Sequence, residues 1–288
     1  MNDAIKMMLA RYNCRDTKDF ENALKEIIQE IALLGLWRSK FFEKAAFYGG
    51  SALRILYKLD RFSEDLDFSL LEKNRDFSLD YYCKAIEFEL KSFGFIVTIE
   101  KKEKSRESNI DSAFIKAGTR QNMILINIPK LASQKIHAKK ALKIKFEVDV
   151  TPPQGFRVEA KYLFHPIPFS VNTYVPSDLF AGKLHAILYR SWETRVKGRD
   201  WYDLVWYVSH NTPVHLQHLE NRMKQTENLK KNFSLTEKKL KEILLKKIKT
   251  VNFDNAKKDV ENFIKDASSL KLWSEEYFRV ICKKIKTV

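Results

Sequence analysis

Two aspartates separated by one residue have the clearest chemical potential in this sequence. Asp65 and Asp67 lie in the segment DLDFSLL, residues 65–71, whose alternation predicts a strand. Side chains at i and i+2 of a strand point to the same face, so the two carboxylates lie together. Carboxylates a few ångströms apart repel each other unless a cation lies between them, and hard oxygen ligands at this spacing suit Mg²⁺. The pair therefore predicts a magnesium site.

A third carboxylate for this site is available further along the chain. In the β-rich segment KIKFEVDV, residues 143–150, Phe146 and Val148 share one face, and Glu147 and Asp149 share the other with Lys145. If this strand lies beside the first, Asp149 completes a two-metal site with the aspartate pair. We therefore predict three metal ligands that are also catalytic residues: Asp65, Asp67 and Asp149.

A glycine turn precedes the aspartate pair. Gly49 and Gly50 end a predicted strand at 46–50, and Ser51 opens a predicted helix at 51–58. The amides of a first helical turn and a hydroxyl beside them can hold a phosphate at the positive end of the helix dipole. The turn therefore predicts a phosphate cradle. The alternative is that it is only a turn and that the aspartates are solvated polar residues at the edge of a sheet.

The predicted elements change in type near residue 175. Before it, helical and β-rich patterns alternate; after Pro176 the pattern is helical. The predicted helices are 18–34, 51–58, 80–93, 178–192, 200–209, 214–231, 235–249, 254–267 and 274–285, and the predicted strands are 46–50, 65–71, 95–100, 115–118, 124–128 and 144–150. We expect an α+β fold with a mixed sheet in residues 1–175 and a helical domain in residues 176–288.

The first two helices of that second domain carry a set of charged side chains. Lys183 and Arg190 lie at i and i+7 on one helix face, in a segment without net charge. They can reach the phosphates of a nucleotide or an RNA, or they can be a solvated surface pair. Asp200 and Asp203 lie at i and i+3 on the next helix. Either can be an acid of the site, or Asp203 can pair with Lys183 or Arg190 and only orient them.

The positive charge is concentrated in two segments. The chain carries 52 Lys and Arg against 37 Asp and Glu, a net charge of +15; residues 101–147 hold +8 and residues 221–288 hold +9, whereas residues 1–100 hold −2 and residues 148–220 hold zero. Clustered basic charge indicates a polyphosphate partner, usually a nucleic acid. The alternative is a lysine-rich solvated surface.

Several classes of protein are disfavoured by composition. No apolar run reaches the ~18 residues that cross a bilayer, so we expect no membrane span. Three scattered cysteines form neither a disulfide framework nor a CxxC site. We expect a monomeric protein of the reducing cytoplasm.

The string GGSALRILYKLDRFSEDLDFS, residues 49–69, resembles the AbiEii/AbiGii family of toxin nucleotidyltransferases, within the DNA-polymerase-β-like nucleotidyltransferase superfamily. The resemblance continues through DLFAGKLHAILYR at 178–190 and KGRDWYDLVWY at 197–207, and it weakens beyond about residue 230. It implies a polymerase-β-like core. It also implies that the serine turn holds nucleotide phosphates and that the three aspartates bind two Mg²⁺ ions while a hydroxyl attacks the α-phosphate and displaces pyrophosphate.

The resemblance also assigns roles in the second half of the chain. It implies that Lys183 is needed for activity and that Asp200 or Asp203 matches the last acidic motif of the family. We expect the catalytic set to be Asp65, Asp67, Asp149, Lys183, Asp200 and Asp203, and the nucleotide-binding set to be Gly49, Gly50, Ser51, Lys183 and Arg190.

The implied function is that of a toxin in a toxin–antitoxin or abortive-infection (phage-defence) pair. It would use NTP and Mg²⁺ to add nucleotides to an RNA 3′ end, the tRNA acceptor stem, and so block translation; a cognate antitoxin is implied. The two basic segments would then contact the tRNA. Two alternatives stay open: a nucleotidyltransferase that modifies a protein or a small molecule, and a nucleotide- or nucleic-acid-binding regulator without catalysis.

Overall fold

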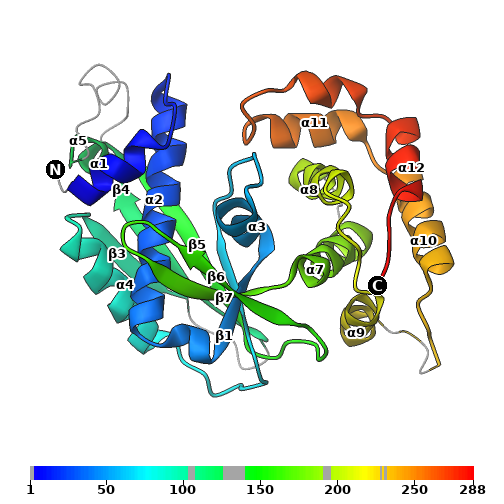
Figure 1. Ribbon diagram of the computed structural model, residues 1–288, viewed down its shortest axis with the longest axis horizontal. Helices are drawn as coiled ribbons and strands as arrows, with labels where there is room; N and C mark the ends of the chain where they lie inside the picture. Colours follow the sequence, from blue (N-terminus) through cyan, green and yellow to red (C-terminus); the bar gives the residue numbers. More distant parts are fainter. Residues whose placement is uncertain (1–2, 103–107, 126–139, 191–195, 228, 230–231) are drawn as a thin grey trace. The chain divides into compact units, whose positions relative to one another are not determined.

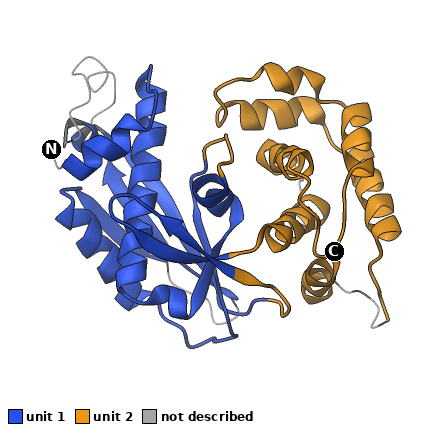
Figure 2. Ribbon diagram, in the orientation of Figure 1, with its two compact units in different colours: residues 1–57, 63–152, 159–173 blue, residues 58–62, 153–158, 174–288 orange. Residues whose placement is uncertain are grey.

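Figure 1 shows the computed structural model of the chain, which describes residues 3–102, 108–125, 140–190, 196–227, 229 and 232–288. The chain divides into two compact units, coloured separately in Figure 2. Unit 1 comprises residues 1–57, 63–152 and 159–173. Unit 2 comprises residues 58–62, 153–158 and 174–288.

Unit 1 is built on one seven-stranded mixed sheet in the order β3-β4-β5-β2-β1-β7-β6. The strands are β1 (Ala45–Tyr48), β2 (Leu66–Leu70), β3 (Val97–Lys101), β4 (Ile110–Gly118), β5 (Ala141–Asp149), β6 (Val158–Leu163) and β7 (Phe169–Tyr174). The central strand β2 runs parallel to β5 and antiparallel to β1, and β1 runs parallel to β7. The expected α+β fold with a mixed sheet is therefore confirmed. Strands β6 and β7 were not among the predicted elements. The prolines between and around them indicate breaks in regular structure, so the sequence pattern alone predicts no strand there.

The helices of unit 1 are α1 (Asp3–Ala10), α2 (Thr17–Arg38), α3 (Gly49–Tyr57), α4 (Asp80–Ser92) and α5 (Thr119–Leu125). The long helix α2 begins where the sequence predicts, because the Asp16 side chain accepts a hydrogen bond from the amide of Asp19 at 2.8 Å. Helices α2 and α4 lie against each other and contribute apolar side chains to one core with the sheet (Figure 1).

Phe68 lies at the centre of that core. Leu66, Phe68 and Leu70 of β2 are buried on one face of the sheet. The Phe68 ring lies 5.0 Å from the ring of Phe41 and 5.3 Å from that of Phe146, in edge-to-face arrangements. Because side chains alternate along a strand, burial of this set sends the intervening residues of β2 to the other face.

One predicted strand is wrong in the part that the structure describes. We predict a strand at 124–128, but Ile124 and Leu125 end helix α5, and the remaining residues lie outside the described ranges. A short apolar run fits a strand and a helix equally well by periodicity. Tertiary contacts favour the helix here: the Asn122 side chain accepts from the amide of Ile96 at 2.9 Å and donates to the carbonyl of Ile96 at 3.0 Å.

Unit 2 is helical after β7, as predicted. Its helices are α7 (Pro176–Tyr189), α8 (Gly198–Ser209), α9 (Leu216–Thr226), α10 (Glu237–Lys249), α11 (Phe253–Glu261) and α12 (Glu275–Lys283). Gly198 permits the close approach of α8 and α11, since a Cβ placed on it would lie 1.8 Å from the carbonyl oxygen of Ala256. None of the described helices combines the length and the apolarity that crossing a membrane requires.

The two units do not correspond to two continuous lengths of chain. The main change falls between Thr173 and Tyr174, close to the predicted division near residue 175, but segments 58–62 and 153–158 also belong to unit 2. As functional domains, 1–175 and 176–288 stay a prediction.

Candidate active site

The predicted carboxylates lie on the face of the sheet opposite the aromatic core. We call this the polar face; it carries Asp67 and Ser69 of β2, and Lys145, Glu147 and Asp149 of β5. The parallel register places Asp67 directly opposite Glu147 and Ser69 opposite Asp149. Asp65 immediately precedes β2. The structure thus brings the carboxylates of two strands onto one face, as expected from their alternation.

The register favours a different third carboxylate from the one predicted. Residues opposite each other on neighbouring strands lie closer together than diagonal neighbours do. Glu147 is therefore nearer to Asp67 than Asp149 is. Asp149 has a local role as well, because its Oδ1 accepts a hydrogen bond from the amide of Thr151 at 3.0 Å. The alternating pattern already put Glu147 on this face, but only the register distinguishes the two acids.

The donor chemistry of this face fits Mg²⁺, since carboxylate oxygens from Asp65, Asp67 and β5 are the ligands that this ion takes. In the residues that the structure describes, however, no three His, Cys, Asp or Glu side chains gather closely enough to hold a metal ion. Lys145 forms an ion pair with Glu147 at 2.7 Å and occupies one of its oxygens. Magnesium binding thus requires these side chains to turn towards a shared ion, and the metal ligands stay a prediction.

The glycine turn packs directly on the aspartate pair. Gly49 has a φ of +82°, and a Cβ placed on it would lie 2.6 Å from Oδ2 of Asp67. Only glycine meets both conditions without strain. Gly49 and Gly50 form the start of α3, so their amides belong to the first turn, which lacks carbonyl partners within the helix.

The Ser51 hydroxyl, which we expected to help hold a phosphate, bonds the protein backbone instead. The Ser51 side chain is buried, and its Oγ donates a hydrogen bond to the backbone carbonyl of Asp65. The hydroxyl thereby ties the start of α3 to the residue that leads into β2. A phosphate role for Ser51 stays a prediction, with its backbone amide as the available donor.

A second cluster of charges lies within unit 2. The Nζ atom of Lys183, on α7, donates to Oδ1 of Asp200 at 2.7 Å and pairs with Oδ2 of Asp203 at 2.8 Å. Arg190 donates to Oδ2 of Asp200 at 3.2 Å. Both aspartates of α8, which the sequence analysis left as alternatives, therefore contact Lys183.

This network fixes the charge of Lys183. Burial alone would lower the pKa of its ammonium, but Asp200 and Asp203 hold that pKa above its ordinary value. Burial would likewise raise the pKa of Asp200, yet Lys183 and Arg190 hold it below its ordinary value. Lys183 is thus a permanent cation at neutral pH and cannot serve there as a general base.

The sequence analysis missed Arg61, which completes the network. Arg61 is 2% exposed, and its Nε and Nη2 donate to the two oxygens of Asp203, each at 2.6 Å. Its position in the motif string, four residues before Asp65, is visible in the sequence. Its partner, 142 residues away, is not.

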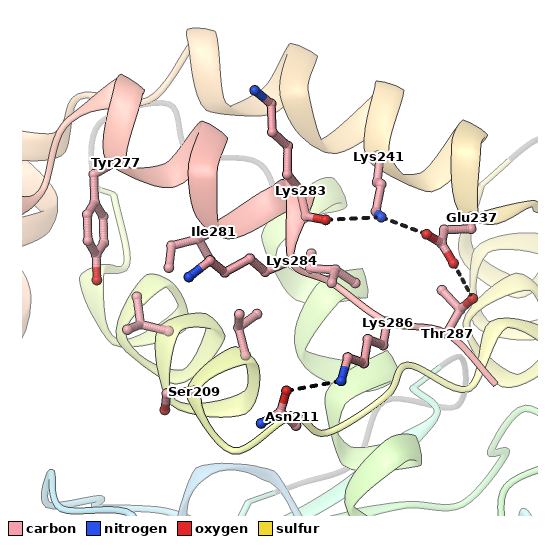
Figure 3. A pocket seen from close by; sticks show the side chains of 13 residues that line it. Ser209, Asn211, Glu237, Lys241, Tyr277, Ile281, Lys283, Lys284, Lys286 and Thr287 are labelled. Carbon is pink, nitrogen blue, oxygen red and sulfur yellow. Dashed lines mark hydrogen bonds and ion pairs between the residues drawn. The ribbon is translucent and has the colours of Figure 1, made fainter.

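A basic pocket lies elsewhere in unit 2, between α8, α10, α12 and the C-terminal segment (Figure 3). Its volume is about 900 Å³. Apolar side chains of Val205, Val208 and Ile281 line it together with the lysines 241, 283, 284 and 286. Lys241 donates to Glu237 at 2.6 Å, and Lys286 donates to Asn211 at 3.1 Å. The four lysines belong to the basic segment 221–288, and Glu237 is the one acid among the lining residues.

The sequence as a whole matches a family model described as nucleotidyl transferase AbiEii toxin, type IV toxin–antitoxin system, over residues 31–279. The chain belongs to the AbiEii family. The match includes the glycine turn, the aspartate pair, β5, and helices α7 and α8. The predicted resemblance is confirmed, and the chain is a toxin nucleotidyltransferase by family. Membership implies an NTP substrate and an antitoxin partner.

Two solved structures from Helicobacter pylori are similar to the AbiEii chain. One, of a protein assigned as a nucleotidyltransferase, has a TM-score of 0.48 and 18% sequence identity, and the alignment covers 89% of this chain and 90% of that one. The other, of the protein JHP933, has the same TM-score and identity, with coverages of 90% and 89%. Likeness at this level says nothing about the reaction. No curated protein matches the chain.

The contact between Gly49 and Asp67 generates a testable prediction. Gly49→Ala will impair nucleotidyl transfer at least tenfold, because the new methyl group displaces the Asp67 carboxylate, and strain at a positive φ costs roughly 1–2 kcal/mol. Transfer of labelled nucleotide and urea unfolding of the purified variants measure the two effects.

Gly94→Ala is the matched control. Gly94 has a φ of +90°, and a Cβ placed on it meets nothing within 4 Å. We expect a similar loss of stability with transfer retained. Equal activity of the two variants would show that the packing of Gly49 on Asp67 is irrelevant to the reaction.

Proposed function

We propose that this AbiEii toxin transfers NMP from NTP to an RNA 3′ end, the acceptor stem of tRNA, and thereby blocks translation in the cytoplasm. The observation that carries the proposal is the in-register pair of Asp67 and Glu147 beside the Gly49 turn, in a chain of a nucleotidyl transferase family. Phosphoryl transfer requires positioning and charge neutralisation more than covalent chemistry, and these residues supply both.

In the proposed reaction, Asp65, Asp67 and a carboxylate of β5 hold Mg²⁺. When bound, the ion would neutralise phosphate charge and activate the attacking oxygen. The register supports Glu147 as the β5 ligand nearest Asp67; Asp149 is the ligand that the sequence predicts. A carboxylate of β5 then accepts the proton of the attacking RNA hydroxyl, and pyrophosphate leaves.

The phosphates of the NTP are assigned to backbone and cationic groups. The first-turn amides of α3, from Gly49, Gly50 and Ser51, form one set of donors. Lys183 supplies a fixed positive charge, which its raised pKa supports, and Arg190 adds a second cation. Asp200 and Asp203 orient Lys183 in this scheme, since both bond its ammonium.

The basic surfaces support an RNA acceptor. Lys116, Lys143 and Lys145 share the polar face with the carboxylates, and the basic pocket gathers further lysines in unit 2. Lysine ammonium groups bind phosphodiesters without reading the base sequence. An RNA held by its backbone and reacting at its end needs this combination of basic surroundings and an acidic reaction centre.

Labelling of RNA tests the proposal. The purified protein, incubated with each α-labelled NTP, MgCl₂ and total cellular RNA, will label tRNA. Asp67→Asn will reduce the labelling by about 10³-fold or more, because it removes a metal ligand without changing the shape of the side chain. A label on protein or on a small molecule would replace tRNA as the acceptor, and the absence of any label would indicate a binding regulator.

The β5 carboxylates generate a second prediction, measured as transfer against Mg²⁺ concentration. Glu147→Gln will raise the Mg²⁺ concentration for half-maximal activity by tenfold or more, since it removes the acid opposite Asp67. Asp149→Asn, the matched amide substitution two residues away, will shift it less. A larger shift for Asp149→Asn than for Glu147→Gln would identify Asp149 as the third ligand instead.

The pocket lysines generate a third prediction, about tRNA affinity. Lys284→Ala together with Lys286→Ala will weaken tRNA binding, and the slope of log K against log salt will fall by about one unit per lysine, because each lysine releases a counterion when it contacts phosphate. Lys84→Ala with Lys91→Ala, exposed on α4, is the charge-matched control. Equal slopes for both pairs would exclude the pocket from the RNA contact.

A further inference from the structure

The first five residues of the segment that joins α3 to β2 pack within unit 2. Residues 58–62 belong to that unit, although the chain before and after them belongs to unit 1. Three polar contacts hold the segment: the hydroxyl of Tyr202 donates to Asp60 at 2.8 Å, the amide of Phe62 donates to the carbonyl of Phe263 at 2.8 Å, and Arg61 forks onto Asp203.

Arg61 forms the strongest of these contacts. Its two parallel hydrogen bonds to a fully buried carboxylate are each 2.6 Å long. Its Nη1 also donates to the carbonyl of Phe62 at 2.9 Å, so the guanidinium is fixed on three sides. A planar guanidinium matches a carboxylate in a way that an ammonium cannot.

The same carboxylate also holds Lys183. Oδ2 of Asp203 lies 2.6 Å from Nη2 of Arg61 and 2.8 Å from Nζ of Lys183. Asp203 is therefore shared between two cations, and its orientation is determined by the bidentate partner. The position of the Lys183 ammonium follows from that orientation.

We propose that Arg61 is a positioning residue that acts through Asp203 to set the location of the Lys183 ammonium. This inference rests on the proposed role of Lys183 in holding nucleotide phosphates. Arg61 itself does not contact the nucleotide. Its contribution therefore disappears when Lys183 is absent, which a residue of purely structural importance would not show.

A double-mutant cycle on NTP affinity tests the inference. Arg61→Lys keeps the positive charge but cannot form the two parallel hydrogen bonds to Asp203. We expect it to raise the KM for NTP about tenfold and to change kcat much less, an effect of the size that is typical when a residue supporting a ligand-binding group is replaced. Lys183→Ala will raise the KM more. The double variant will be no worse than Lys183→Ala alone.

Arg157→Lys is the matched control. Arg157 also pairs with a fully buried aspartate of unit 2, since its Nε lies 3.3 Å from Oδ2 of Asp178, but no bond links that pair to Lys183 in the described structure. It will leave the KM unchanged. Additive losses in the Arg61→Lys, Lys183→Ala double variant, or an equal effect of Arg157→Lys, would overturn the positioning role.

The outcomes separate this inference from the proposed function. If Lys183→Ala leaves NTP affinity and transfer intact, the role of Lys183 fails and Arg61 has nothing to position. If Lys183→Ala impairs affinity and Arg61→Lys does not, only the inference about Arg61 fails. The cycle needs only variants that fold, which thermal unfolding of each purified protein verifies, and Arg61→Lys is chosen because it leaves no buried charge without a partner.

Discussion

The alternation of β2 is the constraint on which the candidate site depends. Leu66, Phe68 and Leu70 are buried in the aromatic core, so Asp67 must face the other way. A shift of one residue would bury the carboxylate and expose Phe68, which fixes the register strongly. The parallel pairing with β5 then places Glu147 opposite Asp67. Adjacent like charges are unfavourable, and the ion pair of Lys145 with Glu147 offsets part of this repulsion.

The charged side chains of the Lys183 network in unit 2 are stabilised differently, by pairing of opposite charges. There, Arg61, Lys183 and both carboxylates are largely removed from water and must satisfy one another, because an unpaired buried charge costs several kcal/mol. Lys183 lies between two aspartates; Arg190 bonds the other oxygen of Asp200, and Arg61 bonds both oxygens of Asp203.

The sequence predicts those features that depend on local pattern. The Asp16 cap, the glycine turn, the two faces of β2 and β5 and the helices after Pro176 all follow from periodicity or from the preferences of single residues. Features that depend on distant partners are not predictable this way. Glu147 and Asp149 are equivalent until the register is known, Ser51 has no evident partner until Asp65 lies beside it, and Arg61 looks like a loop arginine until α8 supplies Asp203.

The chain passes between the two units five times, after residues 57, 62, 152, 158 and 173. Neither unit is therefore a single uninterrupted piece of the gene. A recombination event that exchanged one end of the coding sequence would separate Arg61 from α8 or leave part of unit 2 behind in the other parent. The bond between Arg61 and Asp203 therefore joins two stretches of the gene that lie 142 codons apart.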